Sequence, residues 1–337
     1  MTRRAKKFAG IILLVLIVFF TLGITFTVGW RPFIGPKTRP LTARHFASTP
    51  ARMARGKYLV EAVTGCIGCH SPADVSKPGA PPIETKLGAG QPWPDKQLPW
   101  LVAPNITPDK ETGAGNWSDD VLARAIREGI GHDGRALFPV MPYQNYRTMS
   151  DEDLASIIVY IRSLAPVRNA PGQTNMPFPL KYLTRNTPTP VYGAVNGPDQ
   201  SSVVERGSYL VRMGSCADCH TPQQRGQPIV GLDFAGGFVL DGPTGLLVTP
   251  NITPDASGIG YYDENLFVQS MREGKVGARQ LNAAMPWWFY GKMTDEDLKS
   301  VFAFLRTLKP VQHRVDNTEK PTACHVCKQK HGLGNKN

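Results

Sequence analysis

The stretch Cys66-Ile-Gly-Cys69-His70 decides the fold, and a second copy, Cys216-Ala-Asp-Cys219-His220, follows later in the chain. Both copies read C-x-x-C-H, the pattern for covalent attachment of a c-type haem. Two thiols reach the vinyl groups of one porphyrin, and the histidine that follows binds the iron from the same side. A redox dithiol or half of a zinc site is the alternative, but neither needs a histidine directly after the second cysteine. The two motifs therefore predict two covalently bound haem c groups.

The same ordered motifs surround both haem sites, which predicts a duplicated domain. R-G-x-Y-L-V begins at residues 55 and 206, P-N-I-T-P-D at 104 and 250, R-E-G at 127 and 272, and M-[ST]-D-E-D-L at 149 and 293. Apolar residues at helical spacing after Leu154 and Leu298 predict a closing helix in each copy. A glycine inside each opening helix, Gly56 or Gly207, indicates close approach of another element. We expect a mainly α fold with two small helical domains and long loops, over 51–165 and 201–310.

The N-terminus sets the predicted topology. Four basic residues between Arg3 and Lys7 precede an uncharged apolar stretch from Phe8 to Trp30. Such a stretch is long enough for one transmembrane helix, and the positive-inside rule keeps its basic end in the cytoplasm. Residues 1–30 are therefore predicted to be a basic start and an anchor, and 31–50 a spacer. Everything after Trp30 is then expected across the membrane. Hydropathy does not name the compartment, but bacterial c-type haems are attached in the periplasm, so we expect the haem domains there, on a single-pass protein of the inner membrane. A cleaved signal peptide is the alternative, although no A-x-A-like site follows.

The net charge of +11 comes from an excess of basic residues at the two ends of the chain. Residues 1–50 carry eight basic and no acidic side chains, and 311–337 carry five basic and two acidic ones. The middle is therefore neutral, which argues against a nucleic-acid partner. Attraction to an anionic membrane surface fits the charged ends better.

Two methionine pairs recur in register as candidates for the second axial ligand of each iron. Met149 and Met293 stand directly before helix N-caps, where a hydrophobic staple explains them. Met141 and Met285 each precede a proline, which biases them to extended geometry in a loop. We therefore predict iron ligation by His70 with Met141 and by His220 with Met285. His132 has no counterpart in the second copy and is a weaker candidate.

Further residues are predicted around the haem groups. Aromatic side chains that follow the two methionines are expected to form pocket walls, and the asparagines of the P-N-I-T-P-D motifs face either a haem edge or their own turn. The residues are Tyr143, Tyr146, Trp287, Trp288, Tyr290, Asn105 and Asn251.

Two segments lie outside the copies. Residues 166–200 contain seven prolines and are expected to be an extended linker. The basic tail, 311–337, holds Cys324-His-Val-Cys327 followed by Lys328, which is no haem motif. A disulfide between Cys324 and Cys327 is the simplest expectation in an oxidising compartment. Free thiols, or a metal bound by these cysteines with His325 and His331, are the alternatives.

Taken together, these motifs resemble those of the membrane-anchored dihaem or multihaem c-type cytochromes that serve bacterial periplasmic dehydrogenases. The resemblance covers about 51–165 and 206–309. It implies an electron acceptor for a dehydrogenase catalytic subunit, with quinone, a terminal oxidase or another cytochrome as the next carrier.

Two six-coordinate irons leave no open position for a substrate, so we expect an electron-transfer protein with no catalytic residues of its own. The alternative is a dihaem enzyme, such as a peroxidase or a thiosulfate-type dehydrogenase. Such an enzyme needs one iron with an open or differently ligated position, which the near-equivalence of the copies disfavours.

Overall fold

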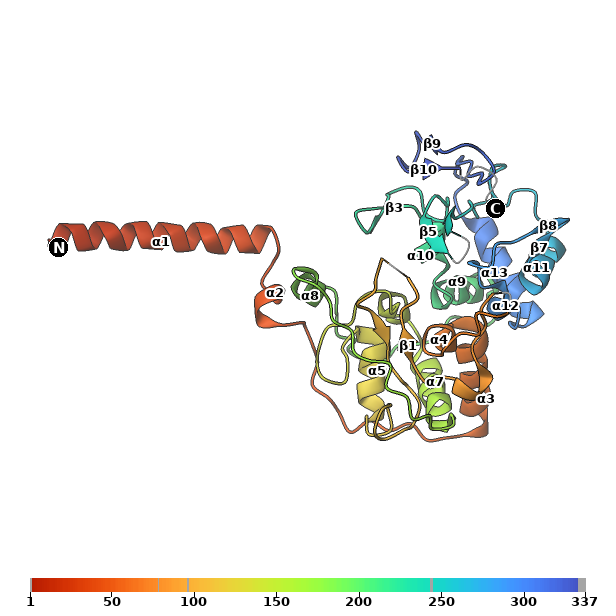
Figure 1. The fold of residues 1–337 in the computed structure, drawn as a ribbon, viewed down its shortest axis with the longest axis horizontal. Coiled ribbons are helices and arrows are strands. Elements are labelled where there is room, and N and C mark those ends of the chain that lie inside the picture. Colours follow the sequence, from red (N-terminus) through yellow and green to blue (C-terminus); the bar gives the residue numbers. More distant parts are fainter. Residues whose placement is uncertain (1, 78, 96, 243–244, 333–337) are drawn as a thin grey trace. The chain divides into compact units, whose positions relative to one another are not determined.

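The computed structural model describes residues 2–77, 79–95, 97–242 and 245–332 and is mainly helical, as predicted (Figure 1). The chain divides into two compact units. Unit 1 comprises Met1–Ala43, Asp120–Arg147 and Asn175–Tyr192, and unit 2 comprises Arg44–Asp119, Thr148–Thr174 and Gly193–Asn337. The units do not follow the predicted copies, because residues 120–147 group with the N-terminal segment. Both C-x-x-C-H motifs lie in unit 2.

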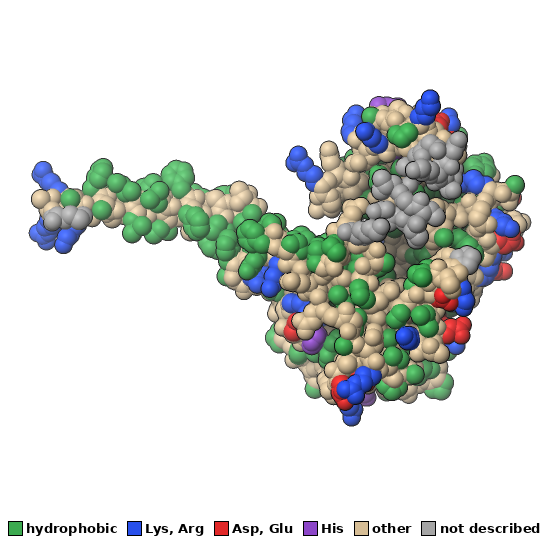
Figure 2. Space-filling model, in the orientation of Figure 1, with side chains coloured by type: hydrophobic (Ala, Val, Ile, Leu, Met, Phe, Trp, Pro, Cys, Tyr) green, Lys and Arg blue, Asp and Glu red, His purple; other side chains and the backbone are tan. Residues whose placement is uncertain are grey.

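Unit 1 contains the N-terminal helix α1, Arg3–Phe26. Its 24 residues extend about 36 Å, more than the roughly 30 Å of a bilayer's hydrocarbon core. Its apolar side chains are almost all exposed, and blue basic side chains gather at its N-terminal end (Figure 2). This helix is long and apolar enough to cross a membrane, and a signal sequence would pass the same test. The other elements of unit 1 are α2 (Arg31–Ile34), α5 (Asp119–Glu128, from its second residue), α6 (Tyr143–Tyr146), α8 (Leu180–Leu183) and η3 (Thr184–Asn186).

Part of the predicted spacer is fixed onto helix α5. The Arg39 guanidinium donates to both carboxylate oxygens of Asp120, at 2.7 and 2.8 Å, and to Glu128 at 2.7 Å. Both carboxylates are buried. Burial raises the pKa of Glu128, and the charge of Arg39 opposes that rise. The segment after α2 is therefore held by a buried ion pair rather than left free.

Unit 2 is organised around two pairs of crossing helices, α3 with α7 and α9 with α13. Each pair joins the opening and closing helices of one copy. A Cβ at Gly56 would overlap the Ser156 carbonyl oxygen, and one at Gly207 would overlap that of Ser300. The predicted close approach is therefore found in both copies. The helices of unit 2 are α3 (Pro50–Tyr58), η1 (Leu59–Val63), α4 (Cys66–Cys69), η2 (Glu84–Lys86), α7 (Asp151–Ser163), α9 (Val203–Met213), α10 (Cys216–His220), α11 (Glu264–Glu273), α12 (Trp287–Tyr290) and α13 (Asp295–Thr307).

The closing helices begin as their sequences predict. The Ser150 hydroxyl accepts from the Asp153 N–H at 3.0 Å, and the Thr294 hydroxyl accepts from the Asp297 N–H at 3.1 Å. These caps satisfy backbone donors that the first helical turn leaves without a partner. Three acidic residues in each first turn add a favourable interaction with the helix dipole.

Short antiparallel strand pairs lie in the loops of unit 2, and the last pair follows α13. The pairs are β1 (Gln91–Pro92) with β2 (Val102–Ala103), β3 (Gln223–Gln224) with β4 (Gln227–Pro228), β5 (Val239–Gly242) with β6 (Gly245–Val248), β7 (Lys275–Val276) with β8 (Arg279–Gln280), and β9 (Thr322–Ala323) with β10 (Lys330–His331).

Candidate haem-binding sites

Each C-x-x-C-H motif forms a short helical turn that follows a left-handed residue. Gly65 precedes α4 with φ of 66°, and Ser215 precedes α10 with φ of 55°. This backbone reversal separates the turn from the opening helix. Residues three apart in a helical turn lie on one face, so the two thiols of each motif point the same way. In both motifs the first cysteine is half-buried and the second is exposed.

The histidine of each motif is oriented by a proline carbonyl of the P-N-I-T-P-D motif. The Nδ1 atom of His70 lies 2.8 Å from the Pro104 carbonyl oxygen, and Nδ1 of His220 lies 2.9 Å from that of Pro250. Nδ1 is thereby assigned as the protonated nitrogen, which leaves Nε2 free to bind a metal. Burial lowers the pKa of both histidines, which favours the neutral ring that an axial ligand requires.

The thiols of these motifs have raised pKa values. Burial raises the pKa of Cys66, and it raises the pKa of Cys69 to about 11. The pKa of Cys216 rises to about 12 and that of Cys219 to about 11, again chiefly because of burial. A reactive dithiol needs a lowered thiol pKa. The shifts in these thiols run in the opposite direction.

The two asparagines of the P-N-I-T-P-D motifs bind their own loops. The Asn105 side chain accepts from the Thr107 N–H at 2.9 Å and donates to the Val167 carbonyl at 2.8 Å. Asn251 makes the same bonds to the Thr253 N–H, at 2.9 Å, and to the Val311 carbonyl, at 2.8 Å. Both side chains are buried. These contacts account for the asparagines as turn residues, and their contact with a haem edge stays a prediction.

The two predicted methionine ligands lie in loops of the same local form. The Met285 N–H donates to the Asn282 carbonyl at 3.0 Å, and its own carbonyl accepts from the Trp287 N–H at 2.8 Å. Met141 makes equivalent backbone bonds with Phe138 and Tyr143, at 3.1 and 2.8 Å. Met285 belongs to unit 2 with both histidines, whereas Met141 belongs to unit 1. Ligation of iron by either sulfur stays a prediction.

The alternative candidates for the second axial ligand are two buried methionines and one exposed histidine. Met149 and Met293 are buried, at 1% and 4% exposure, as the hydrophobic staple predicts. His132 is exposed.

The aromatic residues after each methionine pack on the glycine that ends the R-E-G motif. A Cβ at Gly129 would meet the Tyr143 ring, and one at Gly274 would meet the Trp287 ring. Tyr143 and Tyr146 are buried. The buried Nε1 atoms of Trp287 and Trp288 have no hydrogen-bond partner among the described residues.

The indole N–H groups of Trp287 and Trp288, which follow Met285 closely in the chain, have no partner within the part of the chain that the structure describes. Together with the paired thiols and the oriented histidine, they fit the second haem c. The first motif has the same arrangement of thiols and histidine, and these residues fit a haem c as well.

Tyr290 lies between the two attachment motifs. Its hydroxyl donates to the Gly214 carbonyl at 2.6 Å, two residues before Cys216. Burial raises its pKa well above the ordinary value, and the sulfurs of Cys216, Cys219 and Cys69 add to the rise. Phe289, a pocket candidate absent from the sequence-based set, contacts the position of Gly65. The two motifs are therefore neighbours across helix α12.

The opening and closing helices also exchange hydrogen bonds between the copies. The Tyr58 hydroxyl donates to the Asp297 carboxylate, and the Tyr209 hydroxyl donates to Asp153 at 2.7 Å. An arginine of the same copy also binds each carboxylate, Arg206 on Asp297 at 2.6 Å and Arg55 on Asp153 at 2.8 Å. The pattern is reciprocal, as in an isologous dimer interface. It explains the repeated tyrosine of the R-G-x-Y-L-V motif.

In the tail, the sulfurs of Cys324 and Cys327 are not joined, and they lie close to His313 and His331. His325 is exposed and lies outside this group.

Comparison with known proteins places the chain in a family. The model of the cytochrome c family matches residues 53–165 and 204–309, which include both C-x-x-C-H motifs. The chain belongs to the cytochrome c family. This match confirms the predicted fold class, a mainly helical chain with two cytochrome-c-like regions after an apolar N-terminal helix. Membership of this family supports haem c as the cofactor.

Three relatives illustrate the similarity. The cytochrome c subunit of gluconate 2-dehydrogenase from Pantoea cypripedii is 31% identical over 282 residues, which are 77% of this chain and 60% of the relative. The cytochrome c subunit of the quinone alcohol dehydrogenase from Gluconobacter oxydans (strain 621H) is 27% identical over 77% of this chain and 55% of its own length. A "Diheme cytochrome c-type" protein of Cereibacter sphaeroides is 25% identical over 82% of this chain and 93% of its own.

The chain thus spans 60% or less of the two dehydrogenase subunits. The predicted resemblance is nevertheless confirmed, because these relatives are cytochrome subunits of dehydrogenases or a dihaem cytochrome. Their names also agree with the expectation of an electron-transfer subunit rather than a catalytic one.

Proposed function

We propose that this protein is a membrane-anchored dihaem c-type cytochrome, which passes single electrons from a dehydrogenase to the respiratory chain. The observation that supports this most strongly is the matched pair of histidines, each with Nδ1 on a proline carbonyl and Nε2 free. Bound haem c supplies an iron that alternates between ferrous and ferric states and so carries one electron at a time.

In this proposal the chain holds two haem groups covalently. Cys66 and Cys69 form the thioether bonds of the first, and Cys216 with Cys219 those of the second. His70 with Met141, and His220 with Met285, are the axial ligand pairs. The proline carbonyls keep each imidazole in one tautomer and one orientation through both oxidation states.

The surroundings of helix α12 support transfer between the two sites. Tyr290 and Phe289 stand beside both attachment motifs. The reciprocal Tyr–Asp bonds join the helices of the two copies. We propose that this contact keeps the sites at a constant separation, so that electrons pass between them without a domain movement.

We further propose that α1 is a retained anchor of the inner membrane and that the haem regions lie in the periplasm. Basic residues before an exposed apolar helix support this orientation. The domain limits of the prediction, 51–165 and 201–310 with a linker at 166–200, form part of the proposal.

The names of the relatives support a dehydrogenase as the electron donor. They include cytochrome subunits of gluconate, alcohol and fructose dehydrogenases. We propose that the partner is a catalytic subunit that oxidises a small alcohol, aldehyde or sugar acid. The next acceptor would be quinone, a terminal oxidase or another cytochrome.

Ligand variants of the full chain test this function. Met141→Ala and Met285→Ala should each convert one iron from low-spin to high-spin and lower its reduction potential by on the order of 0.1–0.3 V, part of the roughly 0.8 V range that axial ligands set. Electron paramagnetic resonance and redox titration would measure both changes.

The matched controls are Met149→Leu and Met293→Leu, which repack a buried site and should leave the spectra unchanged. Unchanged spectra in both alanine variants would refute the ligand assignment. A high-spin iron in the resting wild-type protein, with peroxide turnover, would favour the dihaem enzyme instead.

A further inference from the structure

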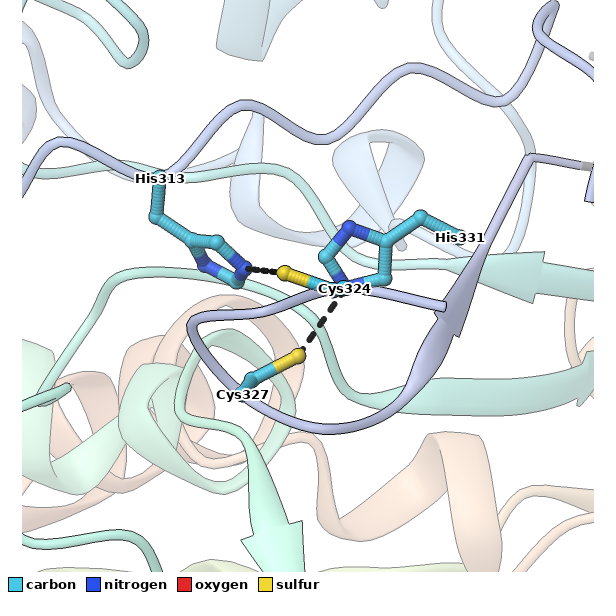
Figure 3. Close-up of side chains that lie close together, drawn as sticks. All are labelled: His313, Cys324, Cys327 and His331. Atoms are coloured by element: carbon cyan, nitrogen blue, oxygen red, sulfur yellow. Dashed lines mark hydrogen bonds between the residues drawn. The ribbon is translucent and has the colours of Figure 1, made fainter. Parts of the chain in front are cut away.

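Four metal-binding side chains converge in the C-terminal tail, outside both haem sites. Ligand atoms of His313, Cys324, Cys327 and His331 all lie within 4.8 Å of one another (Figure 3). Cys324 Sγ is 3.4 Å from His313 Nε2, and Cys327 Sγ is 3.1 Å from His331 Nε2. Around a tetrahedral zinc ion with ordinary bond lengths, neighbouring ligand atoms lie about 3.3–3.8 Å apart. We propose that these residues form a Cys₂His₂ zinc site.

The backbone of the tail is arranged as a support for the two cysteines. Strands β9 and β10 pair as a hairpin, and Cys324 and Cys327 lie in the turn between them. The Val326 N–H donates to Cys324 Sγ at 3.3 Å, and the Cys324 N–H donates to the Gln329 carbonyl at 2.8 Å. These two bonds fix the turn and the position of the Cys324 sulfur within it.

His313 is held ready for a metal in the same way as the haem histidines. Its Nδ1 lies 2.8 Å from the Ala235 carbonyl oxygen, so Nε2 faces the cysteines. The ring is buried at 1% exposure, and Cys327 is buried to the same extent. A backbone carbonyl on the second nitrogen is the usual support of a metal-bound histidine.

The first copy provides a comparison at the position of His313. The closing helices begin at residues 151 and 295, and residues 169 and 313 keep this spacing. Asn169 donates from its side chain to the Ala89 carbonyl at 2.7 Å, as His313 contacts Ala235. The hydrogen bond needs no histidine, because asparagine makes it in the first copy. The extra nitrogen of His313 is therefore unexplained by the fold.

The main chain passes close to the cluster at Gly237. A Cβ at Gly237 would lie 2.8 Å from the His313 ring and 3.3 Å from both Cys327 Sγ and His331 Nε2. Gly237 also has φ of 93°, which side-chain-bearing residues rarely adopt. Glycine at this position therefore lets the main chain pass close to three of the four side chains.

A zinc ion here would tie the tail to the second haem region. The Gly236 N–H donates to the His220 carbonyl at 2.7 Å, next to Ala235, which contacts His313. The Asn251 side chain also donates to the His313 carbonyl, at 3.3 Å. The site therefore stabilises the loop around the second histidine and not its counterpart in the first copy.

Metal analysis of the full-length protein tests the proposal. We expect one zinc per chain, with X-ray absorption at the zinc edge giving two sulfur and two nitrogen neighbours. His313→Asn restores the residue of the first copy and should keep the hydrogen bond to Ala235 while abolishing zinc binding. Cys324→Ser should also lose the ion. The control His325→Ala changes an exposed residue of the same turn and should retain it.

Iron content, measured on the same samples, separates this proposal from the haem assignment. Iron should be unchanged in all three variants, whatever happens to zinc. Removal of zinc with a chelator should speed tryptic cleavage after Lys328 and Lys330 by tenfold or more, while cleavage elsewhere stays constant. A wild-type chain without zinc whose mass is two hydrogens lower, as a Cys324–Cys327 disulfide requires, would overturn the proposal. Zinc retained in His313→Asn would overturn it equally.

Discussion

The two copies in this chain agree in the contacts of the C-x-x-C-H histidine and differ in how the surrounding loop is supported. In both, a proline carbonyl orients the ring and a buried asparagine holds the P-N-I-T-P-D turn. In the first copy Asn169 completes that support, and in the second copy His313 does so beside the cysteines of the tail. The duplication has kept the contacts of this histidine and of the turn in both copies, whereas the second copy has gained a further cluster.

The largest expected effect comes from the helix crossings, which both copies need equally. Gly56→Leu or Gly207→Leu places a side chain against a backbone carbonyl that cannot move aside. Each substitution should destabilise its copy by about 3 kcal/mol or more, because overpacking at a backbone contact has no side chain to rearrange. Chemical unfolding followed at the haem bands would measure the loss. Lys57→Leu, at an exposed neighbouring position, is the control and should change stability by less than about 0.5 kcal/mol.

Equal tolerance of leucine at Gly56 and at Lys57 would contradict the crossing. A large effect in one copy only would show that the two crossings are not equivalent.

An intermediate effect is expected at the two asparagines. Asn105→Ala and Asn251→Ala each leave buried backbone groups without partners, which costs about 1–3 kcal/mol. The second substitution should also reduce zinc occupancy, because Asn251 contacts the His313 carbonyl. Unfolding and metal analysis on the same samples would separate the copies. Loss of zinc in Asn105→Ala would contradict the assignment of the cluster to the second copy.

The smallest effect is a pH dependence at the contact between the copies. Burial and the bond to Asp297 raise the pKa of Tyr58 from 10.0 to about 12. The folded chain keeps this proton longer than the unfolded chain, so the contribution is complete below pH 10 and is lost as the pH rises toward 12. Tyr58→Phe should lose about 1 kcal/mol at neutral pH.

In that variant the decrease in stability between pH 10 and 12 should be shallower than in the wild type. An identical decrease in both proteins would exclude Tyr58 as the titrating group. Ser208→Ala, in the matching helix of the other copy, serves as a control.

Much of the fold could be predicted because its signals are local. The caps at Ser150 and Thr294, the apolar faces of the closing helices and the close approach at Gly56 and Gly207 follow from spacing alone. Each depends on residues within one or two helical turns, or on a glycine that a backbone contact requires.

The long-range partners could not be predicted from the sequence. The carbonyl of Pro104 binds a histidine 34 residues away, and nothing in the motif specifies that partner. The tyrosines of the R-G-x-Y-L-V motif bind the other copy, which no spacing within one copy could indicate. In the tail, the metal alternative drawn from the sequence named His325 and His331 beside the two cysteines, whereas the chain brings His313 and His331 to them. The signal that could have pointed to His313 is its position, because it follows its closing helix at the same spacing as Asn169 does in the first copy.

Haem content and iron coordination in the wild-type protein test the central claim most directly. Two porphyrins per polypeptide, retained on denaturation, should accompany two low-spin irons whose ferric spectra show a methionine-sulfur charge-transfer band. A single porphyrin per chain, or one iron that binds added cyanide or carbon monoxide at rest, would contradict the account.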